Sequence, residues 1–285
     1  MNDRLKRRRP AAARLLALAL AACLGAHAAL AADTEDEGPP AAADSAQARA
    51  ILKQMATFLA SQKSFRVEIS SAYDAMQPTG QKIEFLDKRT LTVRRPHDLR
   101  AETERSDGVK TTVVMNSDTI TAQQVSQNLY AQIPAKPSLD ESLAYFMRDL
   151  RMRMPLAMLL ASDLPARLDK RVVQADLVEE TSILGKPAHH IAGSTGNVDF
   201  QVWVGSGKEP LPYRIVLTYR DAPGQPQFRA SFSDWDLSPW TMSSTFEPKI
   251  AKGAKRIAFV AQVKAAAAPV AASADQVSSA KGAAK

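Results

Sequence analysis

The feature that most constrains this fold is a single helical interruption in a long series of short alternating segments. From Ser64 to Val260 most of the chain alternates apolar and polar side chains with the period of two that is typical of half-buried β-strands. The alternation stops once, from Ser138 to about Asp169, where Met and Leu recur at helical spacing. A sheet with one apolar face needs a cover. We therefore expect this segment, the mid-chain lid, to lie over the sheet.

The alternating segments number about eleven, and turn sequences rich in Gly, Asn and Asp separate them. In the first segment Phe65, Val67 and Ile69 share one side. A twisted sheet of this size is expected to curl. The predicted fold class is therefore mainly β with α: a half-open antiparallel β-barrel, covered by the mid-chain lid and by an N-terminal helix that begins at Asp44 or Ser45.

The mid-chain lid begins with a capping box, because Ser138 and Glu141 have the S-x-x-E spacing. Pro155 and Pro165 interrupt it, and its methionines could repack around an apolar guest. Met and Leu at this spacing are also typical of an ordinary core, so both interpretations stay open. Phe200 and Trp203 fall on opposite faces of one strand, and one of them is expected to face the interior. The residues predicted to contact a ligand are Met147, Leu150, Met154, Leu156, Met158, Leu159, Phe200 and Trp203.

The N-terminal sequence predicts export to the periplasm. A basic region, an apolar region and Ala-rich cleavage options are typical of a secretory signal peptide. Leu20 to Cys23 also fits a lipobox, so Cys23 is either a lipidation site that tethers the protein to a membrane or an ordinary residue of the apolar region. No later segment is apolar enough to predict a transmembrane span. The predicted organisation is a signal peptide (1–32), a flexible leader (33–43), one barrel domain (44–260) and a disordered Ala/Ser/Lys tail (261–285).

The net charge does not predict a nucleic-acid partner. The chain carries a formal +7, but residues 1–32 contribute +5 and residues 261–285 contribute +2, which leaves about zero for residues 33–260. Cys23 is the only cysteine, so the mature domain has no disulfide and no thiol nucleophile. A domain of this size can bury a sufficient core without a disulfide.

The sequence contains no recognisable catalytic motif, and we expect neither an enzyme nor a cofactor or metal site. His189 and His190 are adjacent, but neighbours on a strand point to opposite faces and are expected to be packed or hydrogen-bonded. Asp234 and Asp236 could form an acid or calcium pair, but no third ligand is evident and solvated carboxylates are the favoured interpretation. A hydrolase is the third-ranked function.

Several short sequence segments together resemble the predicted periplasmic proteins classed as domain of unknown function 2092. The resemblance spans about Ala46 to Phe259. The segments that carry it are Asp199–Val204 (DFQVWV), Pro210–Pro212 with Arg214–Thr218, Phe232–Trp235, Gly253–Ile257, the helix Ala50–Lys63 and Arg94–Pro96. It implies membership of the LolA/LolB-like lipoprotein carriers, which have a half-open barrel closed by helices around an apolar cavity for acyl chains. No residue of this chain matches a carrier's docking or release site.

The leading hypothesis is an exported envelope protein that binds a hydrophobic ligand, a lipid or a lipoprotein acyl chain, as a carrier or sensor. An envelope protein or lipoprotein would then be a further partner. The alternative is a non-catalytic interaction module whose barrel is packed and free of ligand. An apolar dye distinguishes the two, because a packed barrel offers it no cavity.

Overall fold

The computed structural model describes residues 42–259 and residue 262. The predicted signal peptide, Cys23, nearly all of the predicted leader and nearly all of the predicted tail lie outside these residues. None of the helices within the described part has the length and apolar character needed to cross a membrane.

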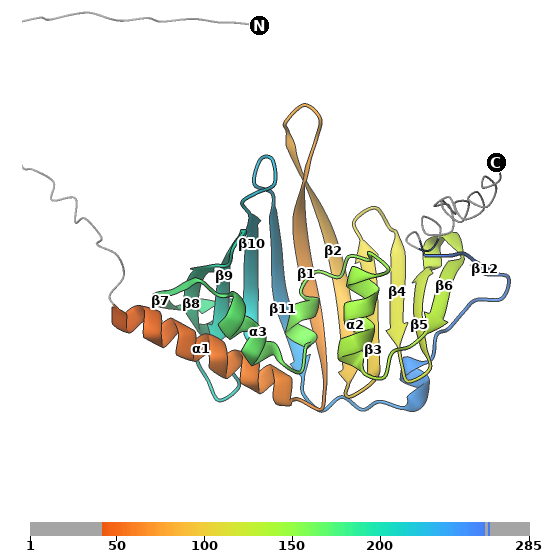
Figure 1. The fold of residues 1–285 in the computed structure, drawn as a ribbon, viewed down its shortest axis with the longest axis horizontal. Coiled ribbons are helices and arrows are strands. Elements are labelled where there is room, and N and C mark those ends of the chain that lie inside the picture. Colours follow the sequence, from red (N-terminus) through yellow and green to blue (C-terminus); the bar gives the residue numbers. More distant parts are fainter. Residues whose placement is uncertain (1–41, 260–261, 263–285) are drawn as a thin grey trace, which may run out of the picture. The chain divides into compact units, whose positions relative to one another are not determined.

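Twelve strands form one sheet in the described part of the chain (Figure 1). They are β1 (Ser64–Met76), β2 (Lys82–Arg94), β3 (Asp98–Arg105), β4 (Lys110–Met115), β5 (Thr119–Gln124), β6 (Leu129–Pro134), β7 (Gln174–Ile183), β8 (Lys186–Ser194), β9 (Val198–Gly205), β10 (Pro212–Tyr219), β11 (Gln227–Asp236) and β12 (Lys255–Arg256). The order is β12-β6-β5-β4-β3-β2-β1-β11-β10-β9-β8-β7, and each neighbouring pair is antiparallel except β12 with β6. Because β12 and β7 are edges that do not pair with each other, the sheet stays open. This confirms the predicted fold class.

The pairing of β1 with β11 joins the two halves of the sheet. Its register places Ile69 opposite Phe232 and Tyr73 opposite Phe228. These strands are more than 150 residues apart in the sequence, so the centre of the sheet is built from both ends of the domain. The β1–β2 hairpin continues past the end of β3, whose pairing stops at Asp87, and Figure 1 shows the hairpin projecting beyond its neighbours.

Three α-helices lie over one face of the sheet (Figure 1). They are α1 (Ala42–Ser61), α2 (Leu139–Arg148) and α3 (Leu164–Arg171), and the short helices are η1 (Val125–Gln127), η2 (Ala157–Leu160) and η3 (Ser243–Phe246). The predicted N-terminal helix and mid-chain lid are therefore confirmed as covers. The core lies between these helices and the apolar side of the sheet.

The ends of the lid helices follow from the sequence. The Ser138 hydroxyl accepts a hydrogen bond from the Glu141 backbone N–H at 3.2 Å, which confirms the predicted cap of α2. Pro165 was expected to break the helical sequence, and it lies in the first turn of α3, where a missing N–H costs nothing. The sequence predicts a last strand from Arg256 to Val260, whereas β12 covers only Lys255–Arg256; residue 260 lies outside the described residues.

Candidate functional site

A small apolar cavity lies between the middle of the sheet and the mid-chain lid. Its volume is about 30 Å³, which is roughly the space of one water molecule. Strand residues form the floor, and lid residues form the roof. The lining residues are Leu59 from α1; Phe65, Val67, Ile69, Arg89, Leu91, Ala101, Phe232 and Trp235 from the sheet; and Met154, Pro155, Leu156, Leu159 and Leu160 from the lid.

Strict alternation along the central strands makes the floor apolar. On β1 the residues Phe65, Val67 and Ile69 are buried, while their neighbours on the strand point to the other face. The rings of Phe65 and Phe232 lie 5.7 Å and 5.9 Å from that of Trp235. The Trp235 Nε1–H donates to the Pro212 carbonyl at 3.3 Å, so the one polar atom of this aromatic group is satisfied. The floor is therefore a fixed apolar surface.

The roof is formed by the lid loop, residues 151–161, which connects α2 to α3 and contains η2. Arg151 and Leu156 have φ values of 55° and 64°, a left-handed conformation that is uncommon for residues other than glycine. The backbone N–H groups of Met152, Ala157 and Leu159 donate to carbonyls of α2 or of the loop itself. Within the described residues no hydrogen bond joins the lid loop to a strand. Side-chain packing therefore holds the loop on the sheet.

The structure separates the predicted lid residues into two groups. Met154, Leu156 and Leu159 line the cavity and are only partly buried. Leu150 is almost completely buried in the core, and Met158 packs against the core with its sulfur 3.9 Å from Arg171 Nη1. Met147 is half-buried on α2 and lies outside the cavity lining.

Phe200 and Trp203 lie on opposite faces of β9, as predicted. Phe200 packs against the core on the helix-covered side. Trp203 lies on the other face, where its ring stacks on that of His190 with centroids 4.0 Å apart. Trp203 therefore lies outside the lining of the cavity described above, because the parity of β9 turns it away from the helices.

The sequence interpretation missed Arg89, the one charged residue of the cavity lining. Arg89 occupies the same face of β2 as Leu91 and Val93, so its parity was the available signal. Its side chain is only 12% exposed, and burial lowers the pKa of its guanidinium below the usual value. Its Nε–H donates to Thr103 Oγ1 at 3.0 Å.

The two neighbouring histidines point to opposite faces, as expected. His190 stacks on Trp203, and its Nε2 lies 3.1 Å from Gln201 Oε1. His189 is opposite Val204 in the sheet, with Nδ1 3.7 Å from Glu180. Across the residues that the structure describes, no three or more His, Cys, Asp or Glu side chains are grouped so that they could hold a metal.

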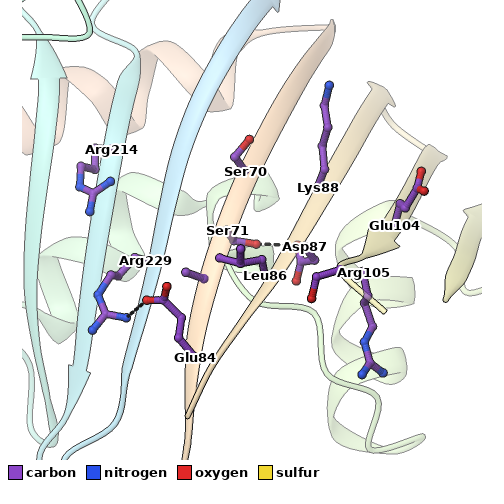
Figure 2. A pocket seen from close by; sticks show the side chains of 12 residues that line it. Ser70, Ser71, Glu84, Leu86, Asp87, Lys88, Glu104, Arg105, Arg214 and Arg229 are labelled. Carbon is purple, nitrogen blue, oxygen red and sulfur yellow. Dashed lines mark hydrogen bonds and ion pairs between the residues drawn. The ribbon is translucent and has the colours of Figure 1, made fainter. Parts of the chain in front are cut away.

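A larger hollow of about 580 Å³ extends over the β1–β2 hairpin and β11, mainly on the face opposite the helices. Figure 2 shows that charged side chains surround it, among them Lys88, Glu104 and Arg214. Arg229 Nη1 lies 3.0 Å from Glu84 Oε2. The hollow is shallow and its charges are paired or solvated, so it does not fit an apolar guest.

Comparison with known proteins identifies a family. Residues 48–260, more than half of the chain, match the model of the predicted periplasmic proteins called DUF2092. This agrees with the resemblance found in the sequence and with the periplasmic location that the signal-peptide sequence predicts. No curated protein matches the chain.

Solved structures with low sequence identity also match. An uncharacterized conserved protein from Thermus thermophilus is 10% identical, with 74% of this chain and 99% of that chain covered and a TM-score of 0.43. The lipoprotein LppX from Mycobacterium tuberculosis is 14% identical, with 69% and 98% covered and a TM-score of 0.43. A LolA superfamily protein from Nitrosomonas europaea is 13% identical, with 70% and 97% covered and a TM-score of 0.36. All three TM-scores lie below 0.5, and the fold assignment rests on the strand order described above.

Proposed function

The chain belongs to the DUF2092 family of predicted periplasmic proteins, and on that premise we propose that it binds a hydrophobic ligand between the sheet and the lid loop. The ligand class is a lipid or an acyl chain, and the role is that of a carrier or sensor in the cell envelope. Residues proposed to contact the ligand are Met154, Leu156 and Leu159 from the roof, with Phe65, Ile69 and Phe232 from the floor.

The observation that carries this proposal is the contrast between floor and roof. The floor is held by strand pairing, whereas the lid loop has no hydrogen bond to a strand within the described residues. Leu156 also adopts a left-handed conformation, which costs on the order of 1 kcal/mol or more. Lifting the loop off the sheet therefore breaks side-chain contacts with the floor and no hydrogen bond to a strand within the described residues, and a guest with an apolar surface can replace those contacts.

The size of the cavity indicates how a ligand would enter. A cavity of about 30 Å³ is far smaller than the roughly 300–1,000 Å³ of typical ligand pockets. A ligand of this class would therefore have to displace the lid loop from the sheet in order to enter. Each buried methylene of an acyl chain contributes about 0.8 kcal/mol, which offsets the lost contacts of the roof.

A second candidate function rests on the same small volume. If the lid loop never leaves the sheet, the interior is an ordinary packed core and the protein is an envelope interaction module. The partly buried state of Met154, Leu156 and Leu159 favours the first proposal, since core side chains at the centre of a domain are normally fully buried.

Titration of the mature protein with an apolar fluorescent dye tests the proposal. A ligand-binding protein is expected to enhance the fluorescence with a stoichiometry of one, and added lipid is expected to displace the dye. If the dye fluorescence does not increase at protein concentrations well above micromolar, the result would support the interaction module instead.

A further inference from the structure

The apolar floor of the cavity ends in a row of polar side chains on the hairpin side. Along β1 the residues Phe65, Val67 and Ile69 are followed on the same face by Ser71, which is 4% exposed. On β2 and β3 the same face carries Asp87 in the row of Ser71, and Arg89 with Thr103 in the neighbouring row, that of Ile69. The sheet register pairs Ser71 with Asp87 and Arg89 with Thr103. This face therefore changes from the apolar row of Val67, Leu91 and Ala101, through the mixed row of Ile69 and Arg89, to the polar row of Ser71 and Asp87.

The guanidinium of Arg89, in the mixed row of Ile69, has unused hydrogen-bonding capacity. Within the described residues its one hydrogen bond runs from Nε to Thr103. Its Nη2 lies 3.7 Å from Asp87 Oδ1, an ion pair longer than a hydrogen bond. That carboxylate oxygen accepts a 2.6 Å hydrogen bond from the Ser71 hydroxyl. Within the described residues no protein acceptor bonds the terminal nitrogens of Arg89, which lines the cavity, so their N–H groups are open to solvent or to a ligand acceptor.

An arginine at this position destabilises the fold, and a purely apolar ligand would not offset that loss of stability. Burying a charge is unfavourable, and a leucine or methionine would pack against the lid loop without that cost. A guanidinium is suited to acceptor oxygens, which it binds through paired N–H groups. Asp87 already balances its charge, so an uncharged acceptor fits better than a second buried anion.

We propose that Arg89 recognises the ester carbonyl of an acylated ligand whose chain lies over the apolar floor. This inference rests on the proposed function, because it assigns a head group to the same cavity. The carbonyl oxygen would accept from the terminal nitrogens of Arg89, while the chain extends toward Phe65 and Trp235 at the other end of the floor.

A pair of matched ligands tests this assignment. Methyl dodecanoate and dodecyl methyl ether have the same length, and only the ester has a carbonyl. Displacement of the apolar dye from the mature protein is expected to show that the ester binds on the order of tenfold more tightly, the ratio for a hydrogen bond to a charged donor. Equal affinities in the wild-type protein would overturn the assignment, and so would dodecanoate anion binding more tightly than the ester.

Two variants locate the effect. Arg89→Met provides an uncharged side chain of similar length, and we expect the ester-to-ether ratio to fall to about one. Arg66→Met is the matched control, since Arg66 lies on β1 and points to the opposite face. It should keep the wild-type ratio. A wild-type ratio in Arg89→Met would contradict the assignment.

The failures of the two proposals are distinguishable. If neither the dye nor either dodecyl ligand binds, the proposed function fails. If both ligands bind equally well, the cavity is real and only the role of Arg89 is wrong. If thermal unfolding shows that Arg89→Met is not folded, the ester-to-ether ratio of the wild-type protein still decides the question. Arg89→Lys should retain a smaller preference for the ester, because lysine keeps the charge but not the paired donors.

Discussion

Replacing Leu159 by Asp should separate binding from folding. Leu159 is a partly buried roof residue, and full burial of a leucine contributes about 1.5–3 kcal/mol. Losing roughly half of that burial costs about 1 kcal/mol. The carboxylate would force the lid loop away from the floor, but no hydrogen bond to a strand is lost within the described residues. We therefore expect the free energy of unfolding to fall by only about 1–2 kcal/mol.

Binding should respond more strongly than stability. A carboxylate in the roof would face the acyl chain and remain without a partner, so the affinity for the apolar dye should fall at least about tenfold. Urea unfolding and dye titration on the same preparation measure the two effects. Leu184→Asp is the control, because Leu184 is 65% exposed in the β7–β8 turn. Wild-type affinity in Leu159→Asp would refute the idea that the lid loop contacts the ligand.

Two further predictions concern residues outside the cavity. Burial would raise the pKa of Asp74, but hydrogen bonds from Arg229 and from the Gln227 backbone N–H lower it overall. The ionised carboxylate therefore stabilises the fold above pH ~4, and this stabilisation is lost as the pH falls through the lowered folded-state pKa. Asp74→Asn should cost about 1–2 kcal/mol in urea unfolding at pH 7 and clearly less at pH 3; an equal cost at both values would contradict this. Trp203→Ala should leave the dye affinity unchanged, because Trp203 lies on the face opposite the lid, and a tenfold loss would show that the wrong face was assigned.

Elements that depend on local pattern could be predicted from the sequence. The alternation of Phe65, Val67 and Ile69 predicted a strand with one buried face, and Ser138 with Glu141 predicted the start of α2. Turn chemistry predicted hairpins between sequential strands. These features depend on side chains within a few residues of one another, so the sequence contains them directly.

Features that depend on long-range pairing could not be predicted. The contact of β1 with β11 follows from how the whole sheet is assembled, and no local pattern encodes it. Arg89 was missed because a charged residue on an apolar stripe looks like an interruption until its neighbours across the sheet are known. Trp203 was placed in the cavity wall on its apolar character, although parity alone could not decide which face of β9 meets the helices.

The most direct test of the central claim is native mass spectrometry of the protein purified gently from its own envelope, followed by solvent extraction. The account predicts a stoichiometric adduct that extraction releases and that contains at least one acyl chain. A mass equal to that of the bare chain, unchanged after incubation with envelope lipids, would contradict the claim and support a packed interaction module.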